Sequence, residues 1–571
     1  MDNPQKPNQV SLTAGQAMDL AMQHHGAGRL PEAESMYRQI LQAYPDQPVA
    51  VHLLGVVAHQ VGQKEIAVDL ISKALAIKPD YLEAHYNLGN VFKEQGRLED
   101  SVACYQKALA IQPDYPEAHN NLGNVFEELG RLDEAVACYR KALAIKPDYL
   151  GAHYNLGNAF KELGRLDEAV ACYRNALAIK PDYPEAHNSL GIAFEELGRL
   201  DEAVACYRKA LAIKPDYLEA YERLGLVCIT LGHFSESRAA FDQAFRIGHG
   251  GPLLDAGKFT EDGCAAISAP TSELATSAFR LRDQIDQLDY LIAKGKIDPS
   301  FQLLSDLYGS VLSETESPEE SGSDLSLSSR QRERLGPFYN RAVHYVDAPR
   351  VDSGALNRSL DFRQIEDSYL SSPMPFTSVD DFLSPEALRS LREFCLESTI
   401  YFSHNRNDFV VSRINTGFHC EVLYQLAEEL KEKFPRVLGG HNLKTWWAYR
   451  HNNQSRGVVA HTDAGAVTFN FWITPDDANL LPDSGGLVVY LKEQPKDWDW
   501  GKYNKYKHTE AVSQEIREFL VDSDKVVLPY RENRAVLFNS YLFHQSDKIQ
   551  FRDGFENRRM NITLLFGNSK G

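Results

Sequence analysis

The chain has 571 residues, too many for one ordinary domain, and its 43% hydrophobic content can fill more than one core. The formal net charge of −19 disfavours a phosphate backbone as partner, so we expect no nucleic-acid binding. The N-terminal MDNPQKPNQVSL lacks the charged and apolar regions of a signal peptide, and no apolar run is long enough to span a bilayer. These features predict a multidomain cytoplasmic protein that has no membrane contact.

After a tail of residues 1–13, residues 14–251 form a repeat array. Prolines recur every 34 residues, at positions 45, 79, 113, 147, 181 and 215. Between them, a Leu-Gly pair, two aromatic residues and small residues recur at spacings that fit two amphipathic helices. Four cysteines share the period, which predicts small packing residues and argues against disulfides or metal ligands: Cys104, Cys138, Cys172 and Cys206.

This pattern resembles the tetratricopeptide repeat, with seven units, and predicts an all-α superhelix with a concave face. In tetratricopeptide proteins that face holds a segment of another protein. The residue before Leu-Gly is Asn87, Asn121 and Asn155 in three successive units, then Ser189 and Arg223. The asparagines resemble the row that grips peptide backbones in O-linked N-acetylglucosamine transferase, because an amide donates and accepts at once. We therefore expect a bound protein or peptide, although asparagine inherited within similar repeats explains the row equally simply.

Three segments of different character follow the array. Residues 252–313 are predicted to be a helical connector, because apolar residues recur at helical spacing between 281 and 292. Residues 314–334 are acidic and rich in serine, which predicts a flexible linker. Residues 335–571 hold all five tryptophans and many short β-prone runs, so a second domain is expected there.

Three His-x-acid tripeptides in the second domain are candidate metal-binding motifs. In a strand, residues i and i+2 face the same way, whereas in a helix they diverge. His419 and Glu421 lead into a helical pattern, and so do His508 and Glu510. Only the tripeptide at residues 461–463 precedes a run that alternates like a strand, AVTFNFWIT. We therefore select this tripeptide as the metal-binding one.

The predicted metal ligands are His461, Asp463 and a distal His544, which ends the β-prone run RAVLFNSYLFH. Two imidazoles and one carboxylate leave coordination positions open, and this set suits non-haem Fe(II). Zinc is the competing metal, because zinc hydrolases use the same ligand types.

Arg559 lies 15 residues after His544, in NRRMNITLLFG, where Arg559, Asn561 and Thr563 share one face of a predicted strand. An arginine there can grip a carboxylate with two hydrogen bonds. With these residues in this order, the second domain resembles the 2-oxoglutarate- and Fe(II)-dependent oxygenases of the prolyl hydroxylase type. The resemblance implies a double-stranded β-helix, or jelly-roll, barrel with flanking helices. Arg558 is the alternative anchor, and the asparagine two positions after Arg559 favours Arg559.

The resemblance also implies the cofactors and their contacts. Fe(II) would be held by the three ligands, 2-oxoglutarate by Arg559 and Asn561, and O2 would be the oxidant. Tyr449 and Asn470 are further predicted contacts of the cosubstrate, although Tyr449 can equally be a packing residue beside two tryptophans. The run SGGLVVY at 484–490 resembles the Gly-Gly turn and strand between the two histidines of prolyl hydroxylases. The segment KDWDWGKYNKYKH at 496–508 interleaves lysines with aromatics and suits a lid or substrate-edge loop.

The expected function is a dioxygenase that hydroxylates a protein or peptide side chain recruited by the repeats. Prolyl 4-hydroxylase α subunits and prolyl 3-hydroxylases resemble this chain in joining such repeats to an oxygenase. A second hypothesis assigns the oxygenase a small metabolite or glycan, with the repeats docking other partners. A third makes the chain a non-catalytic scaffold, but an idle site has no physical need for ionisable groups that face inward.

Overall fold

The computed structural model describes residues 13–250, 276–315, 325, 327–336, 339–405, 409–455, 457–495, 498 and 510–567. Residues 1–12 of the predicted N-terminal tail, the first part of the connector, the first part of the linker and most of the lysine-aromatic segment lie outside these residues. The chain divides into two compact units, Met1–Pro215 and Asp216–Gly571. Within the described ranges, no helix combines the length and the apolar character that crossing a membrane requires.

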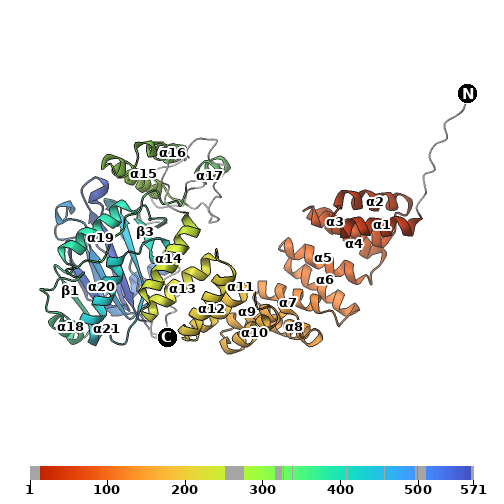
Figure 1. Cartoon of the computed structure of the whole chain (residues 1–571), viewed down its shortest axis with the longest axis horizontal. Helices are drawn as coiled ribbons and strands as arrows, with labels where there is room; N and C mark the ends of the chain where they lie inside the picture. Colours follow the sequence, from red (N-terminus) through yellow and green to blue (C-terminus); the bar gives the residue numbers. More distant parts are fainter. Residues whose placement is uncertain are drawn as a thin grey trace, which may run out of the picture. The chain divides into compact units, whose positions relative to one another are not determined.

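The first unit is entirely helical across its described residues, which confirms the prediction of repeated helix pairs (Figure 1). The two helices of each repeat pack against each other, and the second helix of each of the first five repeats packs against the first helix of the next repeat. In chain order the helices are α1 Ala14–Gly26, α2 Leu30–Ala43, α3 Pro48–Gln60, α4 Lys64–Ile77, α5 Leu82–Glu94, α6 Leu98–Ile111, α7 Pro116–Glu128, α8 Leu132–Ile145, α9 Leu150–Glu162, α10 Leu166–Ile179, α11 Pro184–Glu196 and α12 Leu200–Ile213.

Two glycines per repeat explain the tight helix pairing. Gly130 ends the turn after α7 with a φ of 71°, a conformation that side chains disfavour, and Arg131 then donates its N–H to the Phe126 carbonyl at 2.8 Å. Gly123 lets α8 approach α7, because a Cβ at this position would lie 2.5 Å from Cε1 of Tyr139. The same two positions recur with the 34-residue period, which explains the Leu-Gly pair noted in the sequence.

The second unit begins with the seventh helix pair and continues into a region rich in β-sheet. Its helices are α13 Leu218–Leu231, α14 Phe234–His249, α15 Ala278–Ala293, α16 Gln302–Ser313, α17 Ser329–Leu335, α18 Phe362–Ser371, α19 Pro385–Glu397, α20 Glu421–Lys433, α21 Pro435–Leu438 and α23 Glu510–Leu520. Its strands are β1 Phe376–Val379, β2 Ser403–Asn405, β3 Phe409–Arg413, β4 Leu443–His451, β5 Gln454–Ser455, β6 Val467–Trp472, β7 Leu487–Glu493, β8 Lys525–Leu528, β9 Ala535–Asn539, β10 Leu542–Ser546, β11 Ile549–Gln550 and β12 Met560–Phe566.

The strands form a large sheet of order β1-β9-β6-β12-β4-β3-β2, a small sheet of order β10-β7-β8 and the pair β11-β5. All recorded pairings are antiparallel. One face of the large sheet packs on helices in an extensive apolar cluster, to which Phe469 and Ile562 contribute. The other face, here called the inner face, contributes Trp472 and Phe538 to a cluster with Leu487 and Val489 of the small sheet. The two sheets therefore enclose a shared core.

The seventh helix pair is part of the core of the second unit. Phe241 and Phe245 of α14 belong to the same apolar cluster as the outer face of the large sheet. Arg238 forms an ion pair with Glu421 at the start of α20, and Phe241 stacks on His419 with ring centroids 5.9 Å apart. The boundary of the compact units thus follows residue 215, whereas we predicted a domain boundary at residue 251.

The predicted connector and linker also contribute to this unit. Helix α15 is fixed to the large sheet by a buried ion pair, in which Asp283 accepts from Arg450 of β4. Helix α17 occupies the last part of the segment that we expected to be a flexible linker. It forms because Ser328 and Gln331 cap its N-terminus reciprocally, a local signal that the acidic composition of the segment obscured.

Candidate metal centre

The three predicted metal ligands come together in the structure. His461 pairs with His544 through two backbone hydrogen bonds of 3.0 and 2.9 Å, and this bridge places both imidazoles beside Asp463. The nearest ligand atoms are Nε2 of His461 and Oδ1 of Asp463 at 3.8 Å, and Nε2 of His544 and Oδ2 of Asp463 at 3.6 Å. All three side chains are buried, and their ligand atoms lie within 4.8 Å of one another. This is the size of cluster that holds one ion.

Backbone and side-chain groups orient each of the three. Nδ1 of His461 hydrogen-bonds the Val459 carbonyl at 2.8 Å, and Nδ1 of His544 hydrogen-bonds the Leu542 carbonyl at 3.2 Å. Because a carbonyl only accepts, each Nδ1 carries a proton, which leaves each Nε2 as the ring atom that can bind a metal beside Asp463. Oδ2 of Asp463 accepts from the Thr468 hydroxyl at 2.9 Å.

Arg559 lies buried immediately before β12, beside the Gly-Gly turn that the sequence indicated. It donates to the carbonyl of Gly485 at 2.7 Å and to that of Gly486 at 3.1 Å. The turn requires glycine, because a Cβ on Gly486 would lie 1.9 Å from the Leu528 carbonyl oxygen. Burial lowers the pKa of Arg559 to about 10, so the guanidinium is still charged at neutral pH. No carboxylate in the described part of the chain forms a salt bridge with it.

The structure separates the two candidate anchors. Arg558 points away from the inner face and forms ion pairs with Asp283 and Asp286 of α15. Its role is structural, because it fixes that helix to the sheet. Arg559 is the one that faces the core shared by the two sheets, as the neighbouring asparagine had suggested.

The other predicted contacts share the inner face with Arg559. Asn561 accepts a hydrogen bond from Arg559 at 3.1 Å and lies opposite both Tyr449 and Trp472 in the strand register. Asn470 donates to the Thr563 hydroxyl at 2.9 Å, while its amide oxygen is buried and has no hydrogen-bond partner among the described residues. Burial raises the pKa of Tyr449 to about 12, so its hydroxyl keeps its proton.

Two residues of this face were missed in the sequence analysis, His451 and Trp472. Both ring nitrogens of His451 and Nε1 of Trp472 are buried and lack hydrogen-bond partners among the described residues. The guanidinium carbon of Arg559 lies 5.8 Å from the Trp472 ring, and the backbone of His451 bonds that of Arg559 at 3.0 Å. The strand alternation puts Trp472 on the same face as Asn470. We did not predict it as a contact because an indole at such a position is usually a packing residue.

The asparagine row of the repeats lies along half-buried positions of α5, α7 and α9. Each amide nitrogen bonds a side chain of the preceding repeat: Asn87 to Nε2 of His52 at 2.9 Å, Asn121 to Oδ1 of Asn90 at 3.1 Å, and Asn155 to Oδ1 of Asn124 at 2.9 Å. The row therefore links successive repeats, and a peptide that used these donors would have to replace those bonds.

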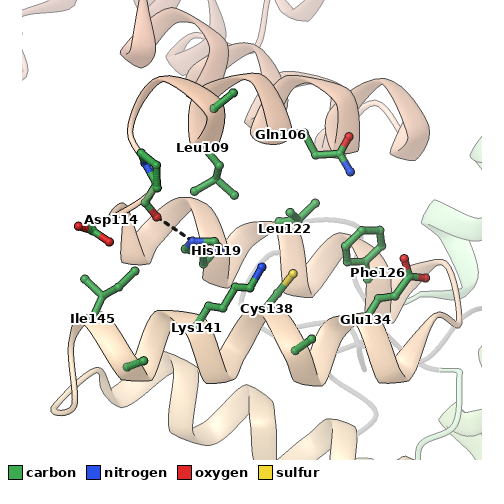
Figure 2. Close-up of a pocket in the computed structure, with 14 residues that line it drawn as sticks. Gln106, Leu109, Asp114, His119, Leu122, Phe126, Glu134, Cys138, Lys141 and Ile145 are labelled. Carbon is green, nitrogen blue, oxygen red and sulfur yellow. Dashed lines mark hydrogen bonds between the residues drawn. The ribbon is translucent and has the colours of Figure 1, made fainter.

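Apolar grooves recur between neighbouring second helices of the repeats. Figure 2 shows the one between α6 and α8, with a volume of about 720 Å³ and His119, Leu122 and Phe126 of α7 at its base. His119 hydrogen-bonds the Pro113 carbonyl at 2.9 Å, and Cys138 lines the wall. Equivalent grooves of about 710 and 700 Å³ contain Cys206 and Cys104. The periodic cysteines are thus buried packing residues, as predicted.

Comparison with protein families identifies the first part of the chain. Models described as TPR repeat match residues 59–96, 89–130, 123–164 and 157–198. Models described as Tetratricopeptide repeat match residues 184–217, 218–247 and 15–39. The chain therefore carries tetratricopeptide repeats across 15–247. Comparison with curated proteins finds no match.

Three solved structures similar to the chain cover about a third of it or less. The crystal structure of MamA is 27% identical, with a TM-score of 0.28, and covers 28% of this chain and 95% of its own. YrrB, described as a TPR protein with an unusual peptide-binding site, is 20% identical, with a TM-score of 0.30, and covers 32% and 95%. Pseudomonas aeruginosa PilF is 20% identical, with a TM-score of 0.32, and covers 35% and 91%.

Proposed function

We propose that the chain is a 2-oxoglutarate- and Fe(II)-dependent dioxygenase that hydroxylates a side chain of a protein or peptide recruited by its repeats. The observation that carries this proposal is the buried group of His461, Asp463 and His544, whose ligand atoms lie within 4.8 Å of one another. The two facing antiparallel sheets support a double-stranded β-helix, with His544 on β10 of the small sheet, His461 bridged to it, and Asn470 on β6 of the large sheet.

The ligand set fits a divalent metal that must keep positions open. Two neutral imidazoles and one carboxylate occupy one side of such an ion, and the hydrogen bonds to Val459 and Leu542 preset the histidine tautomers. Thr468 holds one carboxylate oxygen of Asp463, which limits how the other oxygen can turn. When bound, Fe(II) with O2 and 2-oxoglutarate supplies the oxidation that inserts one oxygen atom into a substrate C–H bond and releases succinate and CO2.

The inner face fits a dicarboxylate. A buried guanidinium without an anionic partner is costly, and a carboxylate placed at Arg559 would offset that cost. The buried Nε1–H of Trp472 and an N–H of His451 would donate to the same ligand, since both atoms lack partners among the described residues. Burial holds the pKa of His451 well below its usual value, so the ring is neutral and keeps one N–H to donate. Asn561 would keep the guanidinium in position.

A protein substrate is favoured by the repeats. Tetratricopeptide repeats bind segments of other proteins, and a groove tethered to the oxygenase raises the effective concentration of a bound chain near the metal. The alternative is a metabolite or glycan substrate, with the repeats docking a separate partner. The repeats also fit the scaffold hypothesis, but the buried ionisable groups of the inner face favour catalysis.

The test is anaerobic titration of the protein with Fe(II) and 2-oxoglutarate, followed by exposure to O2. We expect the visible metal-to-ligand charge-transfer band of a chelated 2-oxo acid, and succinate after oxygen is admitted. His461→Ala should abolish both signals. His24→Ala, which changes a histidine of the first repeat, should leave them unchanged. Absence of the band in the wild type, or its persistence in His461→Ala, would contradict the proposal.

A further inference from the structure

A second group of metal-ligand side chains lies in the seventh repeat. Cys228 on α13, His233 in the turn and Glu236 on α14 place one ligand atom each within 4.8 Å of the others. Cys228 is fully buried and is not in a disulfide, His233 is exposed, and Glu236 is half-buried. One ligand of the group, Cys228, is therefore buried between the helices, and another, His233, is accessible to solvent.

The backbone brings these three positions together in every well-formed repeat. In the fourth repeat they are Phe126, Arg131 and Glu134, where Arg131 lies 4.5 Å above the Phe126 ring and donates to Glu134 at 2.5 Å. The third, fifth and sixth repeats show the same trio, with cation–ring distances of 4.1, 4.5 and 4.5 Å. The backbone of the helix–turn–helix unit therefore brings these three positions together, whichever side chains occupy them.

In the seventh repeat the same positions carry different chemistry. The aromatic residue is replaced by cysteine and the arginine by histidine, while the acid is retained. The turn is kept: Gly232 has a φ of 79°, and the His233 N–H donates to the Cys228 carbonyl at 2.8 Å. In place of the cation–ring stack, the seventh repeat therefore has a thiol, an imidazole and a carboxylate, which is a ligand set for a borderline-soft divalent metal.

We propose that Cys228, His233 and Glu236 form a Zn²⁺ site in the seventh repeat, separate from the candidate metal centre. Three protein ligands leave the fourth tetrahedral position for water, and the exposed side of His233 supplies the entry path. Binding requires the Cys228 thiol to lose its proton, so affinity should rise with pH. Because α13 and α14 belong to the core of the second unit, the ion would clamp a helix hairpin on which that core depends.

Co²⁺ is the probe, because thiolate ligation gives it a sulfur-to-metal charge-transfer band in the near ultraviolet. The candidate metal centre contains no sulfur, so this band reports the Cys228 site and is independent of the proposed oxygenase function. Titration of the reduced full-length chain should produce the band and saturate it by two equivalents per chain, because the candidate metal centre can also take up Co²⁺, and Zn²⁺ should abolish it by displacement. No band in the wild type would overturn the proposal.

Variants assign the ligands. Cys228→Ser should abolish the band, whereas Cys206→Ser, which changes a periodic packing cysteine, should leave it intact. His233→Gln and Glu236→Gln change less buried side chains, so they should fold and weaken Co²⁺ binding at least about tenfold. A band of unchanged strength and affinity in Cys228→Ser, or in both glutamine variants, would overturn the proposal. Circular dichroism of each metal-free variant checks that the fold is retained.

Discussion

The indole of Trp472 lies on the inner face with a buried Nε1–H that has no partner among the described residues. If this N–H donates to a carboxylate of 2-oxoglutarate, Trp472→Phe removes one charge-assisted hydrogen bond and keeps most of the packing. Such a bond contributes about 1.5–3 kcal/mol, so the Kd for 2-oxoglutarate should rise about 10- to 100-fold in calorimetric titration.

Trp446→Phe is the matched control for this variant. Trp446 lies on the opposite face of the sheet, where its Nε1–H donates to the Phe418 carbonyl at 2.6 Å. Its replacement should lower the melting temperature and leave the Kd for 2-oxoglutarate unchanged. Equal effects of the two variants on that Kd would exclude a direct contact from Trp472.

Substitution of Arg558 should mainly lower stability, whereas substitution of Arg559 should mainly lower the affinity for 2-oxoglutarate. Arg558→Gln leaves Asp286 without its ion pair and Asp283 with Arg450 alone, so we expect a loss of about 3 kcal/mol in the free energy of unfolding. Arg559→Gln removes the proposed carboxylate anchor, so the Kd for 2-oxoglutarate should rise at least about 100-fold. Chemical unfolding and calorimetric titration of both variants measure the two effects. A larger loss of 2-oxoglutarate affinity in Arg558→Gln would reverse the assignment.

At the scale of elements, the junction between α14 and the start of α20 should be sensitive to acid. Burial, and to a smaller extent the charge of Arg238, lower the pKa of His419 to about 3, although Asp242 lies 3.8 Å away. Below about pH 6.5 the unfolded chain protonates this imidazole while the folded chain does not, so stability falls on acidification. The contribution is about 2 kcal/mol between pH 6.5 and pH 5, at about 1.4 kcal/mol per pH unit.

His419→Phe tests this contribution. Phenylalanine preserves the stacking on Phe241 and cannot bind a proton. Urea unfolding at pH 7.5, 6 and 5 should show a shallower loss of stability in the variant than in the wild type. Parallel pH dependences would mean that His419 is not responsible.

The elements differ in how far the sequence predicts them. The 34-residue period predicts the repeat helices because each helix depends on residues within its own unit, such as Gly123 and Tyr139. The group of His461, Asp463 and His544 was selected from the strand-like alternation that follows the tripeptide, but His461 itself lies in an isolated bridge to His544 and Asp463 precedes β6, so pairing with a distant segment brings the three together. The binding of iron and of 2-oxoglutarate at these residues stays a prediction.

The roles of other residues could not be predicted from the sequence because they depend on contacts with residues far away along the chain. Arg558 is paired with Asp283 from a helix 275 residues earlier in the sequence, and nothing local distinguishes it from Arg559 except the following asparagine. His451 and Trp472 are candidate contacts of 2-oxoglutarate only because packing leaves their polar atoms without partners in the part of the chain that the structure describes. The seventh repeat keeps the repeat pattern, so its sequence does not reveal that Phe245 packs into the core of the second unit.

At the scale of the whole molecule, the compact units predict which fragments fold. A fragment of residues 216–571 retains α13 and α14, and it should unfold cooperatively as a monomer in thermal scans and size-exclusion chromatography. A fragment of residues 252–571 lacks Ile229, Phe241 and Phe245 of the shared apolar cluster, and exposing their partners should cause aggregation. Equal stability of both fragments would mean that the seventh repeat is dispensable for the fold.

The fragment 216–571 also separates the two substrate hypotheses. It keeps the candidate metal centre and the proposed 2-oxoglutarate contacts, so its oxidation of 2-oxoglutarate in the absence of substrate should match that of the full-length chain. If the substrate is a peptide held by the first six repeats, kcat/KM for that peptide should fall by about 10²- to 10⁴-fold, mainly through KM, because the tether no longer concentrates it. A metabolite substrate should show the same kcat/KM in both proteins. The comparison requires a candidate substrate, which can be sought as proteins that gain 16 Da after incubation of a lysate with the enzyme, Fe(II) and 2-oxoglutarate, with His461→Ala as control.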